Sequence, residues 1–213
     1  TFQDEDAHPS QLETIGDRAF TYTALESVTL PRSVKTVGQE TFSDMEKLRS
    51  VHIGANVEED GLFAAFARTP LLESIEVDAA NLNYQSLDGV LYAQGGTHLA
   101  TYPQAKNKGG AYAVAEGTST IGEGAFSSAQ ITSLTLPSSL RSVNKGAFVG
   151  SQITSLTLPD GFESMDDTAF WYMPKLERVD LGGTTALPNS AFRYDKALAE
   201  VNFRPDLNRL TDV

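Results

Sequence analysis

Apolar residues recur along the chain in a fixed order, with a period of about 22 residues. In the clearest unit, Leu134 and Leu136 alternate with hydroxyl residues and the run ends at Pro137. This alternation, with a β-branched threonine between the leucines, predicts a short strand. The following stretch, residues 143–148, is too short for a full helix and contains Gly146, so we expect a turn or a short 3₁₀ segment there.

The period is also visible as repeated letters. The octapeptide QITSLTLP occurs at residues 130–137 and again at 152–159, and a pair that ends in phenylalanine returns in nearly every unit. The phenylalanines of these pairs are Phe20, Phe42, Phe66, Phe126, Phe148, Phe170 and Phe192. One unit cannot bury its own apolar edge, whereas stacked units can, with each strand pairing in parallel with the next at about 4.8 Å.

Counting from these anchors gives nine units, two of them degenerate, with starts 22–24 residues apart except for one interval of 37 residues. The strand segments are expected to start at Gln3, Leu25, Leu48, Leu72, Gly109, Ile131, Ile153, Leu176 and Leu198. We therefore expect a single domain over residues 1–213. Its fold class is a right-handed repeat solenoid with a parallel β-sheet on one face and little regular helix.

The long interval contains an insertion of 15 residues, the difference between 37 and 22. Two strand-like runs, Gly89–Ala93 and Thr97–Tyr102, flank the pair Gly95-Gly96, which predicts a β-hairpin near residues 88–103. The hairpin either bridges two coils or protrudes as a contact element. In both cases we expect an exposed tip, and a fold that survives shortening of Val90–Tyr102.

The motif L-x-x-[VIL]-x-[LVI]-P followed by I-G-x-x-A-F resembles the BspA-like class of leucine-rich repeats. Leu25–Pro31 and Ile121–Phe126 match it best, and the resemblance covers essentially the full chain. Ordinary leucine-rich repeats carry Asn or Cys where the coil turns away from the strand; here we expect the phenylalanines to fill that role as a stacked aromatic spine. The resemblance implies a secreted or surface-displayed bacterial protein that acts in adhesion to host proteins or to other microbes.

The amino-acid composition argues against several classes of function. Sixteen Lys and Arg against 28 Asp and Glu leave a net charge of −12, which disfavours binding to nucleic acids. The absence of cysteine excludes disulfides and thiol chemistry. No run approaches the roughly 20 apolar residues of a membrane span, so we expect no direct membrane insertion. Any signal or anchor sequence is expected to lie outside this sequence.

Catalytic and metal-binding patterns are missing from the sequence. His8, His52 and His98 fall on different coils, a spread that does not suit a three-histidine metal site. The acidic clusters Asp4–Asp6 and Asp166-Asp167 lack the ligand spacing of an EF-hand loop. We therefore predict that the protein is not an enzyme and that it uses neither a cofactor nor a metal.

The outward positions of the strands form one candidate surface. Most of these positions hold Ser or Thr, which suits either a solubilising face or a polar ligand surface. Toward the end of the chain, charged and amide side chains fill both outward positions of a strand. The candidate residues on this surface are Arg178, Asp180, Glu200 and Asn202, with Arg204 close by.

Aromatic residues near the coil edge form a second candidate surface. Trp171-Tyr172 and Tyr194 follow spine phenylalanines, and Tyr172 and Tyr194 are both two residues past one. Their rings either pack over the neighbouring coil or stay exposed as anchors for a partner or a sugar ring. If they are exposed, one coil spacing of about 5 Å allows them to form a single patch.

Two functions remain open from the sequence. The first is a non-catalytic binding or adhesion module whose partner is an extracellular or host protein, or a glycan. The second is a purely structural spacer that presents another domain. In both cases we expect a monomer, located at the cell surface or secreted.

Overall fold

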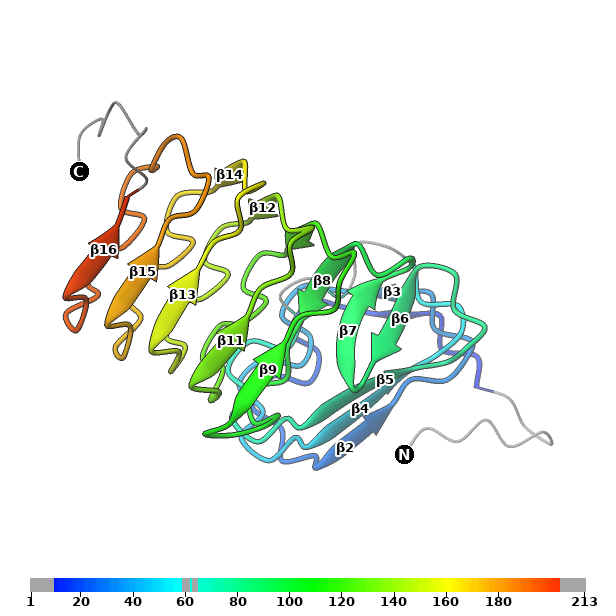
Figure 1. The fold of residues 1–213 in the computed structure, drawn as a ribbon. Coiled ribbons are helices and arrows are strands. Elements are labelled where there is room, and N and C mark those ends of the chain that lie inside the picture. The colour runs from blue at the N-terminus through cyan, green and yellow to red at the C-terminus, as the bar shows by residue number, and fades with distance from the viewer. Residues whose placement is uncertain (1–9, 59–61, 63–64, 204–213) are drawn as a thin grey trace. The chain divides into compact units, whose positions relative to one another are not determined.

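The computed structural model describes residues 10–58, 62 and 65–203. The chain divides into two compact units, residues 1–106 and residues 107–213. Both are stacks of coils about 22 residues long, joined by short parallel strands, and the described residues contain no α-helix (Figure 1). The prediction of a parallel-stranded repeat solenoid with little helix is thus confirmed. Whether the coils of both units form one continuous domain over residues 1–213 stays a prediction.

The described residues of the first unit form eight short strands. They are β1 (Thr14–Ile15), β2 (Ser27–Thr29), β3 (Thr36–Val37), β4 (Ser50–Ile53), β5 (Ser74–Val77), β6 (Tyr84–Leu87), β7 (Val90–Ala93) and β8 (His98–Thr101). Strands β2, β4 and β5 pair in parallel in one sheet, and β1 pairs in parallel with β3 on another side of the coils. The coil that starts at Leu25 therefore contributes to both ladders, through β2 and β3.

The second unit repeats this plan more regularly. Its strands are β9 (Ala111–Ala113), β10 (Thr120–Ile121), β11 (Ser133–Thr135), β12 (Ser142–Val143), β13 (Ser155–Thr157), β14 (Ser164–Met165), β15 (Arg178–Asp180) and β16 (Glu200–Asn202). Strands β9, β11, β13, β15 and β16 lie side by side in chain order (Figure 1). Strands β10, β12 and β14 form a second parallel ladder.

The predicted strand starts are accurate. Eight of them fall two residues before an observed strand, and the ninth, at Gln3, lies outside the described residues. The alternation also has the predicted direction, because Leu134 and Leu156 are buried while the serines and threonines beside them are exposed. In register, Val51 pairs with Val28 and Ile75, so each strand adds one apolar side chain to the core.

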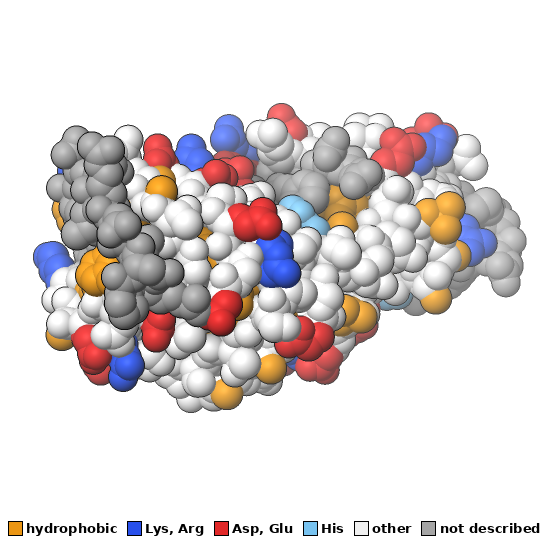
Figure 2. Space-filling view, turned by 45° about the horizontal axis from the view of Figure 1, so that its top comes forward, with side chains coloured by type: hydrophobic (Ala, Val, Ile, Leu, Met, Phe, Trp, Pro, Cys, Tyr) orange, Lys and Arg blue, Asp and Glu red, His pale blue; other side chains and the backbone are white. Residues whose placement is uncertain are grey.

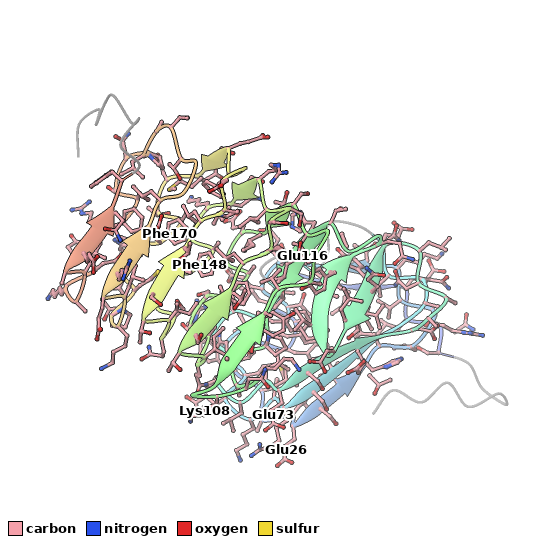
Figure 3. The ribbon with its side chains drawn as sticks, in the orientation of Figure 1. Glu26, Glu73, Lys108, Glu116, Phe148 and Phe170 are labelled. Carbon is pink, nitrogen blue, oxygen red and sulfur yellow. The ribbon has the colours of Figure 1, made fainter. Side chains whose placement is uncertain are left out.

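The predicted aromatic spine is present within each unit. In the second unit the Phe148 ring stacks between those of Phe126 and Phe170, with centroids 5.2 and 5.1 Å away and ring planes within 9°. Phe148 is fully buried (Figure 3). In the first unit the Phe42 ring stacks in the same way between Phe20 and Phe66. The backbone N–H of each of Phe42, Phe126 and Phe148 donates to a carbonyl of the following coil, so the spine and a backbone ladder reinforce one another.

The backbone reverses sharply on both sides of the spine. Residues two positions before and two positions after a spine phenylalanine have positive φ angles in every coil where they are described. The residues before the phenylalanine are Arg18, Glu40, Gly124, Gly146, Thr168 and Ser190. Those after it are Tyr22, Asp44, Arg68, Ser128, Gly150, Tyr172 and Tyr194. We call these two series the left-handed columns. The segment expected as a turn or 3₁₀ piece is a turn with this geometry.

The insertion is a three-stranded antiparallel meander rather than a simple hairpin. The predicted pair β7–β8 is present, and β6 adds to the other edge of β7. Of the two roles left open for the hairpin, packing against the coils fits the structure better than protrusion, because Tyr84, Leu91 and Ala100 belong to the same buried cluster as the coils of the first unit. Gly95 at the β7–β8 turn has open space around it, so the exposed tip also matches the prediction.

Candidate functional site

The left-handed columns decide which side chains lie at the coil edge. Because equivalent residues of successive coils share one backbone conformation, their side chains project in register. In the first unit this places Arg18 beside Glu40, with Nε 2.8 Å from a carboxylate oxygen. It also places Asp44 beside Arg68, with two bonds of 2.5 and 2.7 Å. The guanidinium of Arg68 holds the pKa of Asp44 below its usual value through this pair.

Further ion pairs join adjacent coils elsewhere on the described surface. Lys35 pairs with Glu13, Arg49 with Glu73, and Arg141 with Glu163. Figure 2 shows acidic and basic side chains lying beside one another on this face, with hydrophobic side chains in separate small areas. Glu26 and Glu73, both labelled in Figure 3, belong to the residues just before the strands of the first unit. Such exposed pairs each contribute only about 0–1 kcal/mol.

In the second unit the same edge carries aromatic rings instead of ion pairs. Trp171 lies in contact with both tyrosines of the left-handed column: its ring centroid is 6.3 Å from that of Tyr172 and 6.0 Å from that of Tyr194. The ring planes are inclined by 51° and 57°. The structure therefore brings the three predicted aromatic residues together into one cluster.

The aromatic cluster is exposed. Tyr172 and Tyr194 expose 53% and 49% of their surface, and Trp171 is partly buried. Of the two interpretations left open by the sequence, exposure describes the two tyrosines, whereas the partly buried Trp171 also packs over the neighbouring coil through its contact with Tyr194. Tyr22 occupies the equivalent position in the first unit and is even more exposed, at 80%.

Arg193 completes the cluster, and the sequence pattern did not single it out. Its guanidinium carbon lies 4.7 Å from the centroid of the Tyr194 ring, a cation–π contact. Its Nη2 also donates to the Tyr194 hydroxyl at 3.0 Å. Arg193 occupies the position directly after a spine phenylalanine, as Trp171 does one coil earlier. We call Trp171, Tyr172, Arg193 and Tyr194 the aromatic patch.

Backbone hydrogen bonds fix the two turns that carry the patch. The N–H of Tyr172 donates to the carbonyl of Arg193 at 3.0 Å, and the N–H of Gly150 donates to the carbonyl of Tyr172 at 2.9 Å. The side chain of Asp195 adds a further bond, because its Oδ1 accepts the N–H of Met173 at 2.6 Å. The rings are therefore displayed from a rigid edge rather than from a free loop.

Asp195 is a buried carboxyl directly beneath this edge. Only 9% of its surface is exposed, and its Oδ2 has no hydrogen-bond partner among the described residues. Burial raises the pKa of Asp195 to about 7, and the bond from Met173 opposes the shift only in part. This carboxyl therefore changes its charge near neutral pH.

The predicted strand-face residues are charged or amide side chains, in contrast to the aromatic rings of the patch. Arg178 and Glu200 face each other in register on β15 and β16, with Nε and Oε1 3.8 Å apart. Asp180 accepts the N–H of Gly182 at 3.1 Å, and Asn202 is its partner in register on β16. Arg204 lies outside the described residues. Because Arg178 and Glu200 pair with each other, the strand face offers fewer free charges than the sequence suggested.

The described residues contain no group of three or more His, Asp or Glu side chains that could hold a metal ion. His8 and the cluster Asp4–Asp6 lie outside the described residues. No helix in the described part of the chain has the length and apolar character needed to cross a bilayer.

Comparison with a protein-family profile gives a match to the BspA type leucine rich repeat region. Six copies match over residues 7–87 and 115–212, which is most of the chain. A search among curated proteins finds no significant match.

Solved structures share the fold. A leucine-rich repeat protein from Eubacterium ventriosum is 21% identical, with a TM-score of 0.77 over 91% of this chain and 58% of its own. The pneumococcal vaccine antigen PcpA is 23% identical, with a TM-score of 0.68 over 90% of this chain and 60% of its own. A leucine rich cell surface protein from Faecalibacterium prausnitzii is 22% identical, with a TM-score of 0.60 over 93% and 71%. The chain spans about three fifths of the length of the first two proteins.

Proposed function

Because this chain belongs to the family of BspA-type leucine-rich repeats, we propose that it is a non-catalytic binding module of a secreted or cell-surface bacterial protein. Its partner is an extracellular or host protein, or a glycan, and the module acts as a monomer. The surface location is supported by the name of the Faecalibacterium prausnitzii neighbour, a leucine rich cell surface protein.

The exposure of the aromatic patch carries this proposal. Trp, Tyr and Arg are the residue types that contribute most to binding energy in protein interfaces. Tyr172 and Tyr194 are half exposed, so about half of each side chain remains available for contact with a partner. Large rings held on a rigid edge lose little conformational entropy on binding, so they suit a contact surface better than a solubilising one.

A structural spacer is the second candidate function. It is supported by the strand face, where most outward side chains are exposed serines and threonines and where Arg178 pairs with Glu200. A spacer requires coil stacking but no exposed rings, so the two candidates make different demands on the aromatic patch.

The proposal is tested by screening the chain against immobilised extracellular-matrix proteins and a glycan array. We compare the wild type with the double variant Trp171→Ala/Tyr194→Ala, and use Tyr22→Ala as the matched control because Tyr22 has the same backbone position in the first unit. The expected result is binding that the double variant loses and the control retains, with melting temperatures nearly equal. Binding that is unchanged in the double variant would reject the patch as the site, and no binding to any target would favour the spacer.

A further inference from the structure

The two turns that carry the aromatic patch also concentrate positive charge. Residues 171–175 and 193–197 contain three cations, Lys175, Arg193 and Lys196, all of them exposed. The corresponding turns of the two preceding coils, residues 127–131 and 149–153, contain no charged residue. In a chain of net charge −12, this local excess is the reverse of the overall balance.

These cations lack carboxylate partners. Ion pairs engage Arg141 and Arg178 in the second unit, whereas Lys175, Arg193 and Lys196 form none with any residue that the structure describes. The one carboxyl on the two turns is Asp195, which is buried under the edge and bonded to Met173. A buried carboxyl with its pKa raised to about 7 offers the surface cations little compensation.

Arg193 is pre-positioned to receive a carboxylate. Its contact with the Tyr194 ring and its bond to the Tyr194 hydroxyl hold the guanidinium in one place. A guanidinium has five N–H donors, and the described contacts use one. The remaining donors can bind a carboxylate in the bidentate manner that gives arginine its specificity for such groups.

We infer that the aromatic patch recognises a protein segment that presents Asp or Glu side chains next to apolar ones. This inference rests on the proposed binding function and specifies the chemistry of its ligand. The carboxylates bind Arg193 and the flanking lysines, and the apolar side chains pack against Trp171 and the two tyrosines. A segment of a protein fits better than a sugar ring, because rings inclined by 51° and 57° do not offer one flat stacking surface.

The test selects dodecapeptides from an unbiased displayed library on the folded chain. We expect the selected peptides to be enriched in Asp and Glu beside aromatic or aliphatic residues. Their affinity, measured by fluorescence polarisation, should fall at least about tenfold in Arg193→Gln/Lys196→Gln, because charge-assisted bonds are lost. It should be abolished in Trp171→Ala/Tyr194→Ala and unchanged in Tyr22→Ala and Arg141→Gln, the matched controls for ring and cation.

The other outcomes separate the inference from the function on which it rests. Selected peptides that need Trp171 but show no acidic enrichment, or bind Arg193→Gln/Lys196→Gln unchanged, overturn the acidic-partner inference and leave the binding function standing. Peptides that bind all variants equally, or no peptides at all, reject the patch as a protein-binding site. Binding of sialylated or uronic-acid oligosaccharides that requires Arg193, with no peptide selected, replaces the protein partner by an acidic glycan. Equal melting temperatures confirm that each variant is folded.

Discussion

Thr168 occupies the same left-handed backbone position as Gly146 one coil earlier, with φ angles of 63° and 60°. A β-branched residue is unfavourable at positive φ because its side chain crowds the backbone, whereas glycine adopts this conformation without strain. The two residues thus place a strained and an unstrained version of one turn in neighbouring coils.

We therefore expect Thr168→Gly to stabilise the protein by about 1 kcal/mol, and Gly146→Thr to destabilise it by at least as much. Urea unfolding followed by circular dichroism measures both values. Thr168→Ala separates the causes, since alanine keeps a Cβ and should recover only part of the gain. A Thr168→Gly variant less stable than the wild type would show that the threonine side chain contributes more than its backbone costs.

The aromatic spine should be a main source of stability in the second unit. Phe148 is fully buried between two stacked rings, so Phe148→Ala leaves a cavity and is expected to cost about 3–5 kcal/mol. Thr135→Ala on the exposed strand face should change the free energy of unfolding by no more than about 0.5 kcal/mol. Chemical denaturation of both variants measures the difference, and a loss below about 1 kcal/mol for Phe148→Ala would contradict a structural spine.

The sequence predicts a fold that survives shortening of Val90–Tyr102, whereas the burial of the meander predicts that the insertion is part of the cooperative core of the first unit. Leu91 is fully buried in one cluster with the coil residues, so Leu91→Ala is expected to cost about 2–5 kcal/mol. Inserting a short Gly-Ser segment after Gly95, at the open turn, should leave the melting temperature nearly unchanged. If Leu91→Ala melts like the wild type, the meander is peripheral after all.

Asp195 should make stability depend on pH near neutrality. The pKa of this carboxyl is about 7 in the folded protein against an ordinary value of 3.8, so between these values the folded chain holds a proton that the unfolded chain has released. The free energy of unfolding should therefore fall as pH rises from about 4 to about 7 and then level off. In Asp195→Asn, which keeps an acceptor for the Met173 N–H, this part of the dependence should vanish. Thermal unfolding at pH 5 and pH 8 tests it, and parallel changes in wild type and variant would assign the dependence to other groups.

The sequence predicts the coils well because their causes are local and repeated. A strand that alternates leucines with threonines and a phenylalanine returning every 22 residues determine both the equivalent strands β11 and β13 and the stacking of Phe126 on Phe148. The meander was only half predicted. Strand β6 contains Gln85 and Ser86 and lacks a strong alternation, and its pairing depends on β7, a tertiary contact.

The aromatic patch was predicted as a group of rings but not as a site with charge. Equivalent spacing was sufficient to place Tyr172 and Tyr194 together. The role of Arg193 depends on side-chain directions set by the left-handed columns, which tyrosine and serine at those positions do not reveal. The one signal available was glycine: Gly124, Gly146 and Gly150 mark the same columns in other coils.

The position of Trp171 gives the patch its own optical reporter. The chain contains one tryptophan, and its ring contacts Tyr172 and Tyr194 at 6.3 and 6.0 Å. At these separations the excitation energy of the two tyrosines is transferred efficiently to the indole. The emission of the whole protein therefore originates largely from this edge. A ligand that covers the rings excludes water from the indole and shifts its emission to shorter wavelength. Binding can therefore be titrated on the unlabelled protein, because the emission wavelength of its intrinsic fluorescence reports the fraction of patches that hold ligand.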